Sequence, residues 1–283
     1  MRSLVDLVAP FLSYFSKVVP QTPLPVNGLQ LLQYPPEDQA GVRLDFLPHA
    51  QKIAGTIGFI VNSVRPDGYF AYCVLASYFN PLKMSSIAFR LLLRLARYLT
   101  HTAHLSLTLH SEPPVSAGGS LAGVDLFTGY VDSSHGNAPA GGSYGGFVIM
   151  CRGGGALAWK CAAPSAGDDS TGAAELRMAV LAYKYILAMR TLLVDLDVGV
   201  APTKATDLFS DAQALIDGTG CERLRKSSRW MATRYAMMRW GLACSTIRLA
   251  KVAAADNCAD IVTKCLVGEA FVRHRRTILG LAE

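Results

Sequence analysis

The chain has 283 residues, 51% of them hydrophobic and 17% charged, so it is long enough for one large or two modest domains with a substantial core. Its formal net charge of +6 is consistent with a polyanionic partner, and equally consistent with a basic protein that has no such partner. The seven cysteines form no CxxC pair, and no histidines complete a zinc-ligand spacing. This argues against a metal finger or a disulfide scaffold, and we expect reduced, mostly buried thiols.

The first 110 residues are predicted to be mainly helical. Asp6 and Pro10 interrupt the apolar N-terminal stretch, which we interpret as a packed helix rather than a signal peptide. A proline-rich connector covers residues 18–50. Helical spacing then appears over residues 51–62, 69–79 and 85–100, and a short strand is expected over residues 105–110.

Three arginines share one face of the helix predicted over residues 85–100. Arg90, Arg94 and Arg97 are three and four residues apart, a spacing that places them on one side of a helix. This face is either a solvated surface or a surface that contacts phosphates. The spacing alone leaves both interpretations open.

A linker is predicted to divide the chain. Residues 111–120, SEPPVSAGGS, have the small and polar composition typical of linkers. We therefore expect a helical segment over residues 1–110, a linker over residues 111–124 and a second domain over residues 125–283.

The second domain alternates short strands with helices. Three apolar runs joined by glycine-rich turns predict an antiparallel meander over residues 126–132, 144–150 and 156–160. The rest predicts helices over residues 173–196, 212–217, 227–243, 256–265 and 269–281, and strands over residues 206–209 and 245–252. The long apolar stretch over residues 176–200 carries too many charges for a membrane span. This order predicts an α/β fold with a mixed sheet and helices packed on it.

Four acids lie where these elements begin or end. Asp132 and Asp211 end predicted strands, Glu175 lies about one turn into the long helix, and Asp260 lies in an otherwise apolar turn near the C-terminus. Each has an ordinary explanation as a turn residue, a helix cap or an acid favoured by the helix dipole. As an ordered set, they supply the oxygen ligands that a pair of hard divalent cations needs for phosphoryl chemistry.

Several motifs give the chain a resemblance to a known family. Residues 21–283 resemble the C-terminal part of a Ty1/copia-type retrotransposon polyprotein, and residues 125–270 resemble its RNase H domain. The motifs in the second domain are GYVDSSHG (129–136), GGFVIMCRGGGALAWK (145–160), STGAAELRMA (170–179), LFSDAQALI (208–216) and CADIVTKCL (258–266). Upstream, QTPLP (21–25), IAGTIGFIVNSVRPDG (53–68) and residues 80–100 resemble the segment after the reverse-transcriptase palm.

The resemblance implies an RNase H-like fold, a mixed five-stranded sheet with flanking helices. It also implies an endonuclease that cleaves the RNA strand of RNA–DNA hybrids with two Mg²⁺ (or Mn²⁺) ions held by Asp132, Glu175, Asp211 and Asp260. In that scheme Asp132 and Asp211 are shared or flanking ligands. Glu175 holds a metal and orients the water, and Asp260 serves the metal on the nucleophile side. The expected partner is a hybrid in the cytoplasm or nucleus, with no membrane association.

The sequence departs from the family pattern at several positions. Ala212 replaces an asparagine that contacts the hybrid, Arg229-Trp230 replaces a Lys-His pair, and Cys265 replaces a proline. No histidine precedes Asp260, and no Tyr-x-Asp-Asp motif is present, so no polymerase activity is expected. Two alternatives to the nuclease therefore stay open. One is a non-catalytic nucleic-acid-binding remnant, and the other is an interaction scaffold whose acids are structural caps.

Overall fold

The computed structural model describes residues 1–14, 18–33, 46–110, 126–134, 136, 138, 142–163, 170–196, 204–221 and 226–281. The linker predicted over residues 111–124 lies outside these ranges, so the predicted division into domains stays a prediction.

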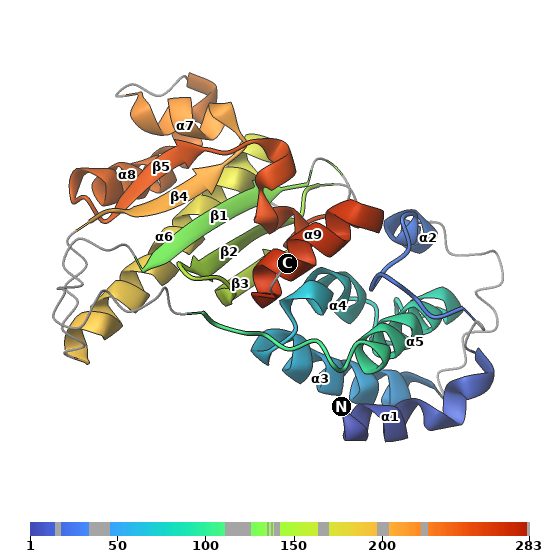
Figure 1. The fold of residues 1–283 in the computed structure, drawn as a ribbon. Coiled ribbons are helices and arrows are strands. Elements are labelled where there is room, and N and C mark those ends of the chain that lie inside the picture. The colour runs from blue at the N-terminus through green and yellow to red at the C-terminus, as the bar shows by residue number, and fades with distance from the viewer. Residues whose placement is uncertain are drawn as a thin grey trace, which may run out of the picture.

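A five-stranded mixed sheet forms the centre of the C-terminal half (Figure 1). The strands are β1 (Phe127–Ser133), β2 (Gly145–Cys151), β3 (Ala156–Ala162), β4 (Thr206–Ser210) and β5 (Ile247–Lys251), in the order β3-β2-β1-β4-β5. β1, β2 and β3 pair antiparallel, whereas β4 pairs parallel with both β1 and β5. The predicted meander and the predicted RNase H-like fold class, a mixed five-stranded sheet with flanking helices, are confirmed.

Both faces of the sheet are covered, and the residues of β2 show how. Phe147 and Ile149 pack into a core with the helices on one face, while Val148 and Met150 pack into a core on the other face. All four side chains are buried, as expected for a central strand whose side chains alternate between two covered faces.

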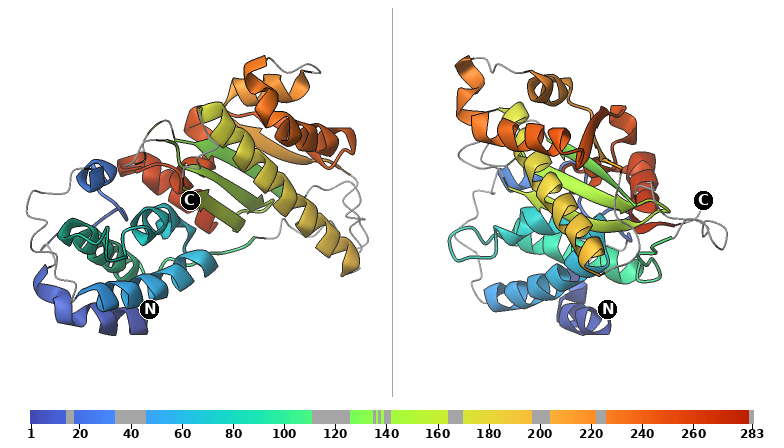
Figure 2. Two further views of the ribbon diagram at one scale, coloured as in Figure 1. Left: turned by 180° about the vertical axis from the view of Figure 1, so that it is seen from behind. Right: turned by 90° about the vertical axis from the view of Figure 1, so that its left-hand side faces the viewer.

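The first face is covered by α6 (Thr171–Asp195) and α8 (Ala232–Ala243). The long helix α6 lies diagonally across this face of the sheet (Figure 2). α6 begins after Ser170, whose hydroxyl accepts a hydrogen bond from the Ala173 amide at 3.3 Å. The short α7 (Gln213–Gly220) follows β4. None of the described helices is long and apolar enough to cross a membrane.

The other face is covered by α9 (Gly268–Leu279) and by the helical segment, which shares one core with the sheet. Its elements are α1 (Arg2–Val8), η1 (Ala9–Tyr14), α2 (Gly28–Gln33), α3 (Leu47–Ser63), η4 (Pro66–Gly68), α4 (Tyr69–Ala76) and α5 (Ser86–His101). The Trp159 indole on β3 donates a hydrogen bond to the Val61 carbonyl at 2.9 Å, and the Phe70 ring meets the Tyr144 ring at 5.4 Å. The helical segment thus packs directly against the sheet.

Three predicted elements differ from the structure. Residues 105–110 form no strand, because their amides bond to the end of α9 and to the β2–β3 turn (Thr108 N to Leu279 O, 2.8 Å; His110 N to Gly154 O, 3.2 Å). The helix predicted over residues 227–243 begins as the 3-10 helix η5 (Lys226–Met231). The helix predicted over residues 256–265 is two short 3-10 turns, η6 (Ala254–Asp256) and η7 (Cys258–Val262), separated by an extended Asn257.

The predicted arginine face of α5 is partly used inside the protein. Arg94 is half-buried and donates a hydrogen bond to the Thr22 hydroxyl at 3.3 Å. Arg90 is exposed. Contact of this face with phosphates stays a prediction.

Candidate active site

Two of the four acids stand at the ends of neighbouring parallel strands. Asp132 is the second-last residue of β1, and Asp211 directly follows β4. Val131 pairs in register with Ser210, so the next residue along each strand is an acid at the same edge of the sheet. The predicted strand-end positions are confirmed, and they place the two acids side by side.

Asp132 is held by the segment that follows η7. Only 2% of its surface is exposed. The Thr263 hydroxyl donates a hydrogen bond to Oδ2, and the Lys264 ammonium lies 3.2 Å from Oδ1. An acid that only closes a strand usually stays in solvent or caps nearby backbone amides. Asp132 instead points inward, toward other charged groups.

Glu175 reaches the same place from α6. It lies in the second turn of that helix, beyond the capping positions, and is 8% exposed. Its Oε1 accepts a hydrogen bond from the Ser133 hydroxyl at 3.4 Å. Burial raises the pKa of Glu175 to about 7, and the charges of Asp132 and Asp211 contribute to the rise. Glu175 is therefore a member of the cluster rather than a helix cap.

Asp260 completes the set from η7. Its Oδ1 lies 2.8 Å from the Lys264 ammonium, so a single lysine contacts both Asp260 and Asp132. Burial raises the pKa of Asp260 to about 6, and the negative charge of Asp132 adds to the rise. Asp211 contributes in the same direction. The four acids predicted from the sequence thus form one electrostatically connected group, which we call the acid cluster.

Asn257 joins η7 to the strand ends, and the sequence reasoning assigned it no role. Its amide nitrogen donates to the Val131 carbonyl at 2.9 Å and to Asp211 Oδ1 at 3.2 Å. Its side-chain oxygen accepts from the Ala259 amide and so caps η7. The only sequence signal was an asparagine three residues before an acid, which is ordinary capping chemistry.

Lys264 was also missed as a site residue. Burial opposes its charge, but Asp132 and Asp260 outweigh that effect, and the pKa of Lys264 is raised above its ordinary value. The ammonium therefore places a positive charge between Asp132 and Asp260. The motif containing Lys264 was noticed in the sequence, but its reach back to β1 could not be read from a residue 132 positions away.

Gly146 lets η7 approach Asp132. It pairs directly with Asp132 across the β1–β2 ladder. A Cβ on Gly146 would lie 2.7 Å from the Thr263 methyl and 2.8 Å from Val262 Cγ2, both closer than side chains tolerate. The absent side chain thus provides the space in which Thr263 reaches the carboxylate.

Of the positions that depart from the pattern expected from the resemblance, Ala212 directly follows Asp211, whereas Arg229 and Trp230 lie in η5. Ala212 is the residue before α7 and has no side-chain capping bond. Arg229 and Trp230 are exposed in η5, and the Arg234 guanidinium lies 5.8 Å from the centre of the Trp230 ring. These are exposed cationic and aromatic groups of the kind that contact nucleic acids. Contact with a hybrid stays a prediction.

The donor chemistry of the acid cluster is that of a hard cation site. All four side chains offer carboxylate oxygens, the ligands that Mg²⁺ and Mn²⁺ prefer. In the described ranges, however, no three carboxylate, imidazole or thiol groups are arranged to hold one metal ion as they stand. Lysine, hydroxyl and amide groups satisfy the carboxylates instead.

Comparisons with known proteins add little to this geometry. No family model matches the chain, and no curated protein matches it. The chain is similar to a solved structure, the N-terminal RNase H domain of Rv2228c from Mycobacterium tuberculosis as a fusion with maltose-binding protein. The identity is 14% and the TM-score 0.34, over 53% of this chain and 96% of that chain. The fold assignment therefore rests on the strand order and directions given above.

Proposed function

We propose that this protein is an RNase H-type endonuclease that cleaves the RNA strand of RNA–DNA hybrids. The supporting observation is the convergence of Asp132, Glu175, Asp211 and Asp260 from four elements onto one edge of the sheet. Burial and mutual repulsion raise the pKa values of Glu175 and Asp260, a pattern that is frequent at functional sites. Structural caps would not require four acids to gather where two of them, Asp132 and Glu175, are buried.

The acid cluster would hold two Mg²⁺ or Mn²⁺ ions. Divalent cations bound there would activate a water molecule and stabilise the leaving oxygen. The all-oxygen donor set and the excess of negative charge fit such ions. Their positive charge would also relieve the repulsion that raises the pKa values of Glu175 and Asp260.

The chain's own residues would hold the metal ligands and the attacking water in position. Thr263 holds one oxygen of Asp132 in a fixed position, and Asn257 does the same for Asp211. Glu175, in the second turn of α6, would hold a metal ion and orient the attacking water.

We also propose that the chain derives from a Ty1/copia-type element. The support is the order of the motifs together with the elements that carry them. Residues 129–136 include the acidic end of β1, and residues 170–179 begin α6. Residues 208–216 join β4 to α7, and residues 258–266 contain η7 and its lysine.

A second candidate is a non-catalytic nucleic-acid-binding remnant of the same fold. One observation favours it: Thr263 and Lys264 already occupy both oxygens of Asp132. The alanine at position 212 adds to it, because it removes a polar contact expected to reach the hybrid. This candidate would bind a hybrid in a salt-sensitive manner without cutting it.

Cleavage of a labelled hybrid distinguishes the two candidates. We expect wild-type protein to cut the RNA strand in Mg²⁺ or Mn²⁺, and Asp132→Asn and Glu175→Gln to lose about 100-fold or more of that rate. The variants are purified identically, which controls for contaminating nucleases, and their folding is checked by circular dichroism. Salt-sensitive binding without cleavage by folded wild-type protein would support the remnant and refute the nuclease.

A further inference from the structure

Lys264 is a positive charge placed inside the acid cluster. Its ammonium lies 2.8 Å from Asp260 Oδ1 and 3.2 Å from Asp132 Oδ1. Asp132 is 2% exposed and the Asp260 side chain 13%, so both carboxylates would otherwise be buried charges with little solvent. The lysine therefore neutralises part of the cluster from within the chain.

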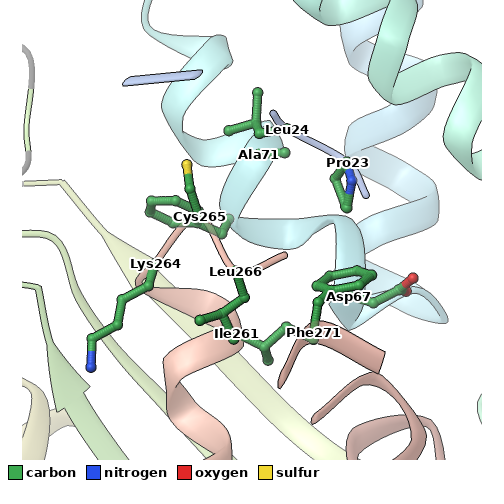
Figure 3. Close-up of a pocket in the computed structure, with 10 residues that line it drawn as sticks. Pro23, Leu24, Asp67, Ala71, Ile261, Lys264, Cys265, Leu266 and Phe271 are labelled. Carbon is green, nitrogen blue, oxygen red and sulfur yellow. The ribbon is translucent and has the colours of Figure 1, made fainter. Parts of the chain in front are cut away.

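The lysine also connects the cluster to the helical segment. It lines a small cavity between η7 and that segment, together with Leu24, Phe70 and Cys265. Figure 3 shows its side chain extending away from the other residues of this cavity, with the ammonium at the far end. The base of the side chain is thus packed at a junction, while the side chain as a whole is 31% exposed and has room to change rotamer.

We propose that Lys264 is a resident cation that competes with divalent metal for Asp132 and Asp260. This inference rests on the proposed function, since it assumes that the acid cluster takes up metal. The ammonium and the metal would use the same two carboxylates, and two cations a few ångströms apart repel each other strongly at a site of low dielectric. Metal uptake therefore requires the ammonium to withdraw toward solvent.

A consequence follows for the function of the site. At low metal concentration Lys264 keeps the carboxylates neutralised, and the cluster binds metal only above a concentration set by this competition. Lys264 thus acts on the metal only indirectly: it sets the metal affinity of the acid cluster by competing for Asp132 and Asp260.

Lys251 provides a matched control. Its ammonium lies next to the same site but bonds to the Asp211 main-chain carbonyl at 2.8 Å rather than to a carboxylate oxygen. Lys251→Met and Lys264→Met therefore remove the same charge from the same neighbourhood. Only the second removes a competitor for the carboxylates.

Binding of Mg²⁺ and Mn²⁺ to the EDTA-treated full chain, without nucleic acid, tests the proposal by calorimetry. We expect Lys264→Met to bind about tenfold or more tightly than wild type, which corresponds to about 1.4 kcal/mol. Lys251→Met should change the affinity by less than about threefold. Equal or weaker binding by Lys264→Met would overturn the competition and leave the proposed function standing. Failure of all three proteins to bind metal would overturn both.

A measurement on wild-type protein covers the case in which Lys264→Met does not fold. In ¹⁵N-labelled protein, the side-chain ammonium signal of Lys264 is followed by NMR as Mg²⁺ is added, with Lys264→Arg used for its assignment. We expect this signal to move toward that of a solvated lysine as metal binds, while the Lys251 signal stays in place. A Lys264 signal that does not change while metal binds would refute the proposal.

Discussion

The tight approach of η7 to β2 makes Gly146→Ala the most informative single substitution. The new methyl carbon would lie 2.7 Å from the Thr263 methyl, 2.8 Å from Val262 Cγ2 and 3.1 Å from the Lys160 carbonyl oxygen. The first two neighbours belong to fully buried, β-branched residues, whose side chains are stiff at χ1. We therefore expect η7 to move away from the sheet, taking Thr263 from Asp132.

The cost can be estimated from known overpacking effects. Inserting one carbon into a packed core costs about 1–3 kcal/mol, and the loss of a buried hydrogen bond to a carboxylate adds about 1–3 kcal/mol. We therefore expect Gly146→Ala to lower the free energy of unfolding by about 2–6 kcal/mol. The assay is urea denaturation followed by circular dichroism, in EDTA at pH 7.

Two other glycines serve as controls. A Cβ on Gly55, in the middle of α3, would meet nothing within 4 Å, so Gly55→Ala should be neutral or stabilise by up to about 1 kcal/mol. A Cβ on Gly145 would meet Met178, a flexible side chain on the opposite face, and Gly145→Ala should leave η7 in place. A Gly146→Ala protein as stable as wild type would show that η7 does not press on β2 as described.

Three further predictions concern the acid cluster. Asn257→Ala should lower the free energy of unfolding by about 1–3 kcal/mol, because it leaves the Val131 carbonyl and Asp211 without their buried donor. An unchanged midpoint in urea denaturation would refute this prediction. The pKa of Glu175 is raised by folding, so its contribution to the stability of EDTA-treated protein should be fully present below pH about 4.5 and fall as the pH rises to about 7, by on the order of 3 kcal/mol. A stability difference between wild type and Glu175→Gln that does not change over this interval would contradict the burial of this acid. Glu175→Gln should remove most of this loss of stability with rising pH, and it should be more stable than wild type at pH 8 in EDTA. An equal loss of stability in both proteins would show that the pH dependence comes from other groups.

The sheet could be predicted because its signals are local. Each strand, its neighbouring glycine turn and its acid lie within a few residues of one another, so the strands and the acids at the ends of β1 and β4 followed from spacing. The position of Glu175, about one turn into the long helix, also followed from local spacing. The catalytic role of these acids stays a prediction.

The contacts that shape the site could not be predicted, because they join residues far apart in sequence. Asn257 bonds across 126 positions to Val131, and Thr263 bonds across 131 positions to Asp132. No local pattern encodes such contacts. They also explain the wrong helix prediction over residues 256–265: the side chain of Asn257 caps η7 and ties it to the sheet, so the segment forms short turns instead of a continuous helix.

The central claim is that the acid cluster is a nuclease site, and hybrid cleavage tests it most directly. Full-length protein is incubated with an RNA–DNA hybrid labelled on the RNA strand, with Mg²⁺, with Mn²⁺ or with EDTA, beside Asp132→Asn prepared in the same way. The account predicts that wild-type protein shortens the RNA with either metal and leaves it intact in EDTA. It also predicts that Asp132→Asn cleaves the RNA at least about 100-fold more slowly. Intact RNA in every lane with folded wild-type protein, or equal cleavage by wild type and Asp132→Asn, would contradict it.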